Sequence, residues 1–384
     1  MIALIDSEQN ISSDWDVVVI GAGLAGGLSA LLHARAGLRT LLIEAKTFPR
    51  NKVCGCCLNS NAWTILERHG LSDTLLAAGS VRLNTVRLSG WGNVLSQPLS
   101  GMHALGRDTL DQTLVDFAVA AGACFLPATR AKVGHVQGDK RSVLLHGAAS
   151  SARTIWAAVV VCADGLGHPS LGDTGFVAAA QPGSRFGLGA TFASADYDDE
   201  HGVLSMIIGE HGYVGLTRID AGRLNLAAAV EPRWLTKHKV AGEAIRAILS
   251  AAGQAIPEGL DRAQWTGTPA LTRSSAHQAG ERLFLIGDAA AYVEPFTGEG
   301  MAWALLGAEL NAEFVRAAAR RWDRNLLLDW ERTWKKYVKR RQLACRVLST
   351  ILKSARLTRL SLRLGSLIPA IPATILRGIN SGLV

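Results

Sequence analysis

Residues 16–44 constrain the fold more than any other part of the chain. An apolar, β-branched run at residues 16–20 (DVVVI) is followed by a glycine-rich turn at residues 21–26 and by an Ala- and Leu-rich stretch at residues 24–36. A second short run (RTLLIE) follows at residues 39–44. Strand, glycine turn, helix and strand within about 30 residues are typical of a βαβ unit, whose parallel strands are buried on both faces. The pattern predicts an α/β (α+β) fold with a Rossmann-type nucleotide-binding domain.

The glycine turn has the spacing Gly-x-Gly-x-x-Gly, with Gly21, Gly23 and Gly26 at the three glycine positions. In such a turn the first glycine permits the tight bend, the second lets the backbone approach a pyrophosphate, and the third lets helix and strand pack closely. The positive end of the helix dipole then faces the phosphates. Glu44, at the end of the next strand, is placed to accept hydrogen bonds from ribose hydroxyls, and its charge would repel a 2′-phosphate. The unit therefore predicts FAD or NAD rather than NADP, and it does not choose between the first two.

A second motif follows an apolar run at residues 282–286. It consists of Gly287, Asp288, Pro295, Gly298, Glu299, Gly300 and Met301, within the segment GDAAAYVEPFTGEGM. With this motif the chain resembles the p-hydroxybenzoate hydroxylase superfamily of FAD-dependent oxidoreductases, in particular its geranylgeranyl-reductase-like, monooxygenase and halogenase-like members. The resemblance implies FAD as the cofactor, with Asp288 at its ribityl or ribose part and the glycines opening a helix aimed at the isoalloxazine ring. A helix-capping role for Asp288 is the alternative.

Three further segments add to the resemblance. Residues 48–55, which include Cys54 and Gly55, look like the loop that packs against FAD in this family. Arg107 looks like its FAD-contacting arginine, and Asp164 belongs to an Asp-Gly pair after a predicted strand, as in the family. A surface ion pair for Arg107 and a plain turn for Asp164 are the alternatives. Cys54 either packs beside the flavin or reacts there.

The six cysteines show no regular framework. Cys54, Cys56 and Cys57 cluster, but no second Cys/His group follows at the spacing of metal ligands, so we expect no metal site. The first ten residues lack the basic segment of a signal peptide, and no uncharged run reaches the length of a membrane span. We therefore expect a cytoplasmic protein with reduced thiols.

The remaining periodicity indicates further strands, a second sheet and a helical end. Strands are predicted at residues 132–137, 142–147, 154–162 and 282–286, an antiparallel sheet over residues 184–230, and helices at residues 109–122, 241–252, from Gly298 onward and over 311–384. We expect three interleaved parts. They are a discontinuous FAD-binding domain (1–80, 101–183 and 271–312), an antiparallel-sheet substrate domain (81–100 and 184–270) and a basic C-terminal helical region (313–384).

Three flavin chemistries fit the resemblance. We prefer a monooxygenase, in which a flavin hydroperoxide transfers oxygen to an apolar or aromatic molecule. The protein then positions the substrate and excludes water, so the sequence identifies no catalytic residue. The second is the saturation of prenyl double bonds, as in geranylgeranyl reductases, but residues 212–218 lack the Trp and Pro usual in that branch. The third is halogenation, which needs a lysine to relay hypohalous acid. It is disfavoured because no lysine occurs between Lys52 and Lys132, where the resemblance would place it.

Two readings outside flavin catalysis stay open. One is a non-catalytic FAD-binding protein, and the other is a NAD-dependent dehydrogenase; motifs that suit both ends of FAD disfavour both. The chain has no second dinucleotide fingerprint. A reductant, either NAD(P)H or a partner protein, is therefore expected to dock transiently.

The second sheet offers apolar side chains for a substrate pocket. They are Met206, Ile207, Ile208, Leu226 and residues 227–230. We expect a bulky apolar or aromatic substrate, with plain core packing as the alternative for each of these residues.

Positive charge is concentrated at the C-terminal end. The formal net charge is +8, and residues 316–384 alone contain 16 Lys or Arg against 3 Asp or Glu. Trp322, Trp330, Trp334 and Tyr337 lie among these basic residues, and leucines follow. The pattern suits peripheral contact with a membrane, and equally a helix pair that covers the FAD-binding domain with a solvated basic face. No nucleic-acid-binding motif accompanies the charge, so we expect no nucleic acid partner.

Overall fold

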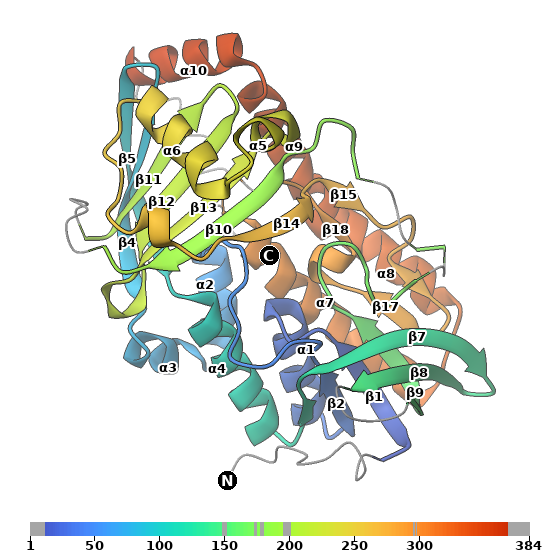
Figure 1. Cartoon of the computed structure of the whole chain (residues 1–384). Coiled ribbons are helices and arrows are strands. Elements are labelled where there is room, and N and C mark those ends of the chain that lie inside the picture. Colours follow the sequence, from blue (N-terminus) through green and yellow to red (C-terminus); the bar gives the residue numbers. More distant parts are fainter. Residues whose placement is uncertain are drawn as a thin grey trace.

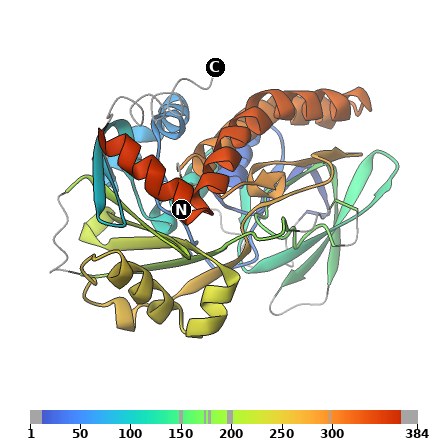
Figure 2. The same ribbon diagram turned by 90° about the horizontal axis from the view of Figure 1, so that it is seen from above.

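The computed structural model describes residues 12–147, 152–172, 175–176, 180–194, 201–294, 296 and 298–367. Two large sheets lie next to each other, the first in the lower half of Figure 1 and the second in the upper half. The C-terminal helices run along the outside from the first sheet to the second (Figures 1 and 2). The predicted α/β class with an additional antiparallel sheet is confirmed.

The first sheet contains the predicted βαβ unit. Its strand order is β16-β17-β9-β1-β2-β6; β8 pairs with β9 and β7 pairs with β8, both antiparallel. The pairs β1–β2, β1–β9, β9–β17 and β2–β6 are parallel. The bounds are β1 (Asp14–Ile20), β2 (Thr40–Ile43), β6 (Cys124–Leu126), β7 (Thr129–Gln137), β8 (Lys140–Gly147), β9 (Arg153–Cys162), β16 (Ala279–Gly280) and β17 (Leu283–Leu285). Successive residues of β1 from Val17 to Ile20 are all buried, because helices or loops cover both faces.

Helices cover this sheet. The central helix α1 (Leu24–Arg35) packs between α4 (Arg107–Ala120) and α7 (Gly300–Arg320), and α7 also contacts α2 (Ser60–Arg68), with α3 (Ser72–Ala77) beyond it. Leu28 and Leu31 of α1 are completely buried in this core. The arrangement places the N-terminal ends of α1, α4 and α7 at the carboxyl edge of the parallel strands, where α/β proteins bind their ligands.

The second sheet has the order β14-β10-β13-β12-β11-β4-β5-β3, antiparallel throughout except for the β4–β11 pair. Its bounds are β3 (Cys57–Leu58), β4 (Val81–Gly90), β5 (Asn93–Ala104), β10 (Phe186–Phe192), β11 (Val203–Gly209), β12 (Gly212–Arg218), β13 (Leu224–Val230) and β14 (Thr266–Ala270). The long β4–β5 hairpin lies mostly within residues 81–100, which were assigned to the antiparallel-sheet domain without individual strands being predicted there. Helices α5 (Pro232–His238) and α6 (Ala241–Ala251) cover one face.

Short elements connect these layers. They are η2 (Asp220–Gly222), η3 (Leu260–Arg262), η4 (Gly287–Ala289) and the small ladder of β15 (Arg273–Ser274) with β18 (Ala291–Tyr292). The segment from η4 to α7 carries the second sequence motif, and it lies between the two sheets (Figure 1).

The C-terminal region is helical, as predicted, up to residue 367; the rest of the predicted helical region, residues 368–384, lies outside the described residues. It comprises α8 (Asn325–Trp334), a π-helical turn η5 (Lys335–Lys339), α9 (Arg340–Leu352) and α10 (Ala355–Leu367). Trp330 is completely buried against the first sheet and donates its indole N–H to the Gln278 carbonyl at 3.1 Å, and Trp334 is also buried. The interpretation of these two tryptophans as membrane-interface residues is therefore wrong; they attach α8 to the core. Among the described residues, no helix combines the length and the apolar character needed to cross a bilayer.

Candidate functional site

The glycine turn between β1 and α1 can be built only with glycine at two of its positions. Gly21 has a φ of +100°, and a Cβ there would lie 2.4 Å from the Ala163 carbonyl oxygen. A Cβ on Gly26 would lie 1.8 Å from the Gly21 carbonyl oxygen, so helix and strand could not approach this closely. Gly23 differs from both. Its φ of −84° is accessible to any residue, and Gly23 lines the cleft that is described below.

Two guanidinium groups flank Gly23. The Nη2 atoms of Arg50 and Arg107 each lie 3.7 Å from the position that a Cβ on Gly23 would take. Arg107 is held by a two-pronged pair with Asp111, with Nε–Oδ1 at 3.0 Å and Nη2–Oδ2 at 2.8 Å. Arg50 bridges Asp111 and Glu44, at 3.2 Å to each. Two fixed positive charges beside a helix N-terminus suit a pyrophosphate.

Arg50 is a residue that sequence reasoning missed as a site candidate. It lies in the predicted FAD loop, but its partner Asp111 lies on α4, and nothing in the local sequence connects the two. The alternative reading of Arg107 as a surface ion pair is wrong, because its side chain is 5% exposed.

Glu44 lies directly after β2 with its carboxylate fixed by backbone groups. Its Oε2 accepts the Ala22 N–H at 3.1 Å, and its Oε1 accepts the Lys46 N–H at 3.1 Å. The carboxylate therefore stands beside the glycine turn, at the end of the site where we expect the ribose.

Asp164 is not brought into the cleft. Its two neighbours, Ala163 and Gly165, line the cleft. The Asp164 carboxylate instead accepts a hydrogen bond from the Ser170 N–H at 2.8 Å. Burial raises the pKa of Asp164. This geometry is that of a turn residue, the alternative reading given above.

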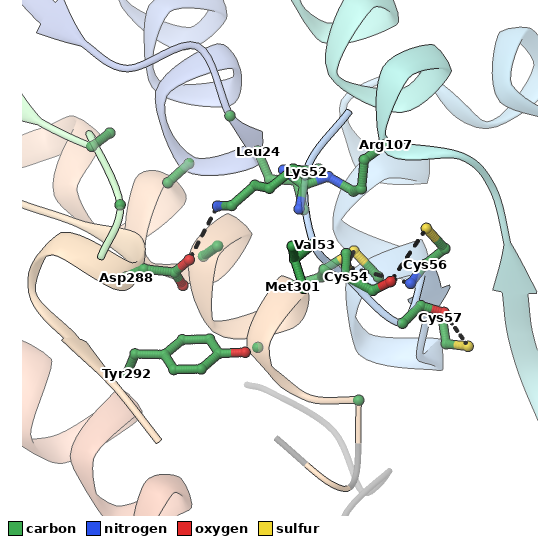
Figure 3. A pocket seen from close by; sticks show the side chains of 18 residues that line it. Leu24, Lys52, Val53, Cys54, Cys56, Cys57, Arg107, Asp288, Tyr292 and Met301 are labelled. Carbon is green, nitrogen blue, oxygen red and sulfur yellow. Dashed lines mark hydrogen bonds and ion pairs between the residues drawn. The ribbon is translucent and has the colours of Figure 1, made fainter. Parts of the chain in front are cut away.

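The N-terminus of α7 opens into the same cleft as the N-terminus of α1. Its lining includes Gly23, Leu24 and Ala25 from the first turn, Asp288, Gly298, Gly300 and Met301 from the second motif, and Lys52, Cys54, Gly55 and Arg107 between them. The cleft has about 720 Å³ of empty space, part of it open to solvent. Figure 3 shows Lys52 reaching across it to Asp288, with Nζ 3.1 Å from Oδ2. Pro295, also predicted here, lies outside the described residues.

The surroundings of Cys54 favour the ionised form of its thiol. The Cys56 thiol hydrogen-bonds to Cys54 and, with the nearby Arg107 charge, lowers the pKa of Cys54 to about 5 against the opposing effect of burial. The Cys56 backbone N–H also donates to the Cys54 sulfur at 3.3 Å. The hydrogen bond to Cys54 correspondingly raises the pKa of Cys56, and burial raises that of Cys57. No group of three potential metal ligands occurs in the described part of the chain.

A second cleft adjoins the first, with about 810 Å³ of empty space. It is lined mainly by apolar side chains from the second sheet and its surroundings, namely Leu166, Leu204, Met206, Tyr213, Ala227, Ala229, Leu271 and Phe296. The two clefts share Lys52, Val53, Cys54, Gly55, Cys57, Asp288, Tyr292 and Gly298. The apolar cleft is therefore continuous with the cleft between the two helix beginnings.

Only part of the predicted apolar lining faces this cleft. Met206, Ala227 and Ala229 line it, and Ala228 borders it as well, whereas Ile207, Leu226 and Val230 pack against α6 on the opposite face. The reason is the two-residue alternation of a strand, which the prediction ignored. Ile208 faces the same side as Met206 and packs near Tyr213 in the core cluster there.

Tyr292, on β18, lies at the junction of the two clefts with its ring directed across the first (Figure 3). Burial raises the pKa of its hydroxyl, and the negative charges of Asp288 and Cys54 raise it further. The phenol is therefore protonated at neutral pH. Sequence reasoning did not identify Tyr292 as a site residue, although it lies inside the second motif.

The charged and hydrogen-bonding groups of the first cleft fit FAD. Arg50, Arg107 and the start of α1 provide positive charge for a pyrophosphate, and Glu44 provides acceptors for a ribose. The start of α7 faces the other end of the cleft. Residues 14–310, more than three quarters of the chain, match the model of a protein family described as FAD binding domain. The chain belongs to this family. It is an FAD-dependent oxidoreductase.

Curated relatives and solved structures agree with this assignment. The chain is 29% identical over 353 residues to the menaquinone reductase of Mycobacterium tuberculosis (strain CDC 1551 / Oshkosh), covering 84% of this chain and 81% of the relative. It is 25% identical over 351 residues to the digeranylgeranylglycerophospholipid reductase of Methanoculleus marisnigri, covering 85% and 83%. The flavin-dependent brominase Bmp2 has the same fold, with a TM-score of 0.77 at 18% identity, covering 96% of this chain and 93% of the brominase.

Proposed function

We propose that this FAD-dependent oxidoreductase is a reductase that saturates a carbon–carbon double bond of an isoprenoid lipid. The observation that carries the proposal is the apolar cleft that opens directly into the flavin cleft past Cys54 and Tyr292. The names of the two relatives supply the substrate class, because menaquinone and a digeranylgeranyl lipid both carry isoprenoid chains. A mainly apolar lining suits such a chain.

The residues at the junction support a reduction. When bound and reduced, FAD supplies a hydride, so the second hydrogen must reach the substrate as a proton from elsewhere. Cys54, with a pKa near 5, holds no proton to give at neutral pH. Tyr292 is protonated there and lines both clefts. We assign it the role of proton donor to the substrate carbon, with solvent replacing the proton after turnover.

The monooxygenase that the sequence favoured is the second candidate. Its support is specific: β12 lacks the Trp and Pro usual in the reductase branch. The apolar cleft would also keep water from a reactive oxygenating site. Both candidates need a reductant, and NAD(P)H docking transiently is part of either proposal.

An anaerobic experiment separates them. The FAD-loaded protein is reduced without oxygen and mixed with a geranylgeranyl lipid, with the fully saturated lipid as control. A reductase reoxidises its flavin with the unsaturated lipid alone and yields a product two mass units heavier for each bond. Reoxidation that requires oxygen, with a product carrying one added oxygen atom, would establish the monooxygenase instead. Tyr292→Phe should bind FAD normally and slow the lipid-dependent reoxidation by about 10²-fold or more.

A further inference from the structure

The outer surface of α9 and α10 exposes an unusual number of large apolar side chains. Leu343 and Val347 of α9 are 63% and 56% exposed, and Leu357, Leu360 and Leu364 of α10 are 49%, 54% and 43% exposed. We call these five residues the leucine face. They make up five of the nine exposed large apolar side chains among the described residues, so such side chains are concentrated here. Figure 2 shows both helices on the outside of the molecule.

Basic residues surround the leucine face. Residues 335–384 contain eleven Lys or Arg and no Asp or Glu. Arg340, Arg356 and Arg359 on the two helices, and Lys353 between them, are exposed. Leucines bordered by Arg and Lys on surface helices are typical of segments that lie in the interface of an anionic membrane.

The inner side of the same helices explains why the leucine face is left uncovered. Leu352 and Leu362 are buried in the same core cluster as Met206 and Tyr213, two residues that line the apolar cleft. The Leu352 carbonyl accepts a hydrogen bond from buried Arg185 at 2.9 Å. One side of α9 and α10 is therefore packed against the protein, and the leucine face on the other side is exposed.

The charge distribution selects the kind of partner. A second copy of this chain, related by a twofold axis, would bring the same basic residues against each other. An anionic bilayer offers both an apolar interior for the leucines and negative headgroups for the arginines and lysines. We propose that the leucine face docks the protein on an anionic membrane surface. The inference stands whichever reaction the flavin performs. A lipid substrate would then be drawn from the same bilayer.

Vesicle co-sedimentation of the full-length FAD-loaded protein tests the proposal. We expect binding to vesicles of phosphatidylcholine with about a third phosphatidylglycerol, weakening as salt rises, and little binding to phosphatidylcholine alone. Replacement of Leu357, Leu360 and Leu364 by Ser should lower the partition coefficient about tenfold or more, because three side chains no longer leave water on docking. The matched control replaces Leu76 and Leu328, which are 49% and 51% exposed on α3 and α8, and should bind as the unaltered chain does.

Retention of the bound-flavin spectrum shows that each variant is folded. Three outcomes would overturn the proposal. The first is that the unaltered protein does not bind anionic vesicles. The second is that the triple variant binds as well as the control. The third is that sedimentation velocity finds a dimer that the triple variant dissociates, since the leucine face is then a subunit interface.

Discussion

Replacement of Gly23 by Ala should weaken FAD binding while leaving the protein folded. The backbone at Gly23 has φ −84° and ψ −171°, which alanine adopts without strain. In the FAD-free protein the new methyl group would meet only the Nη2 atoms of Arg50 and Arg107, at 3.7 Å, an ordinary contact. The free energy of unfolding of the FAD-free protein should therefore change by less than about 1 kcal/mol.

The same methyl group would stand where a pyrophosphate must approach the backbone. One extra carbon in a closely packed site costs about 1–3 kcal/mol. On the FAD dissociation constant that cost is a weakening of about 5- to 150-fold. The assay is fluorescence titration of the FAD-free protein with FAD, accompanied by urea unfolding of the same sample.

Two other glycines make the test specific. Gly26→Ala places its Cβ 1.8 Å from the Gly21 carbonyl oxygen, so it should destabilise even the FAD-free chain, by about 3 kcal/mol or more. Gly267→Ala, on exposed β14 with its nearest neighbours at 3.9 Å, should alter neither property. If Gly23→Ala binds FAD with unchanged affinity, no phosphate approaches this turn and the assignment of the cleft fails.

Three further predictions concern buried groups. Iodoacetamide should alkylate Cys54 of the FAD-free protein with a pH midpoint near 5, the rate falling as pH drops through that value, while Cys57 stays protected until the chain unfolds; peptide mapping that gives a midpoint near that of a free thiol, about 8.5, would contradict the thiolate. Glu294→Leu leaves Arg185 as an unpaired buried charge and should cost about 3–5 kcal/mol in urea unfolding, much of it recovered when Arg185 is also replaced by Met. Trp330→Ala should cost about 3–5 kcal/mol, and a loss below about 1 kcal/mol would mean that α8 is not part of the core.

The sequence predicted best the features whose physical cause is local. The β1–α1–β2 unit could be predicted because buried parallel strands are apolar throughout and a phosphate-binding turn needs glycine. The start of α7 was predicted near Gly298 and lies at Gly300 for the same reason. The bounds of α4, β7, β8 and β9 differ from prediction by a few residues, as is usual for element ends, whereas the three-residue strand β6 was not predicted.

Features that depend on distant contacts were out of reach. Arg50 acquires its role from Asp111, which only the packing of α4 brings near. Composition alone could not tell that Trp330 faces Gln278 rather than a membrane, because the face that a helix buries is fixed by what it packs against. Which of Met206 and Ile207 lines the cleft likewise depends on which face of the second sheet α6 covers.

The strand order of the first sheet also has a consequence for synthesis of the chain. β1 lies beside β9, and β9 lies beside β17, so strands that start at residues 14, 153 and 283 are neighbours. On the ribosome β1 emerges first, and some 270 further residues must follow before β17 does. At 5–20 residues per second the half-built sheet keeps an open edge for about 15–50 s. The cleft also needs Asp288 and the start of α7, so products truncated before residue 300 should be colourless.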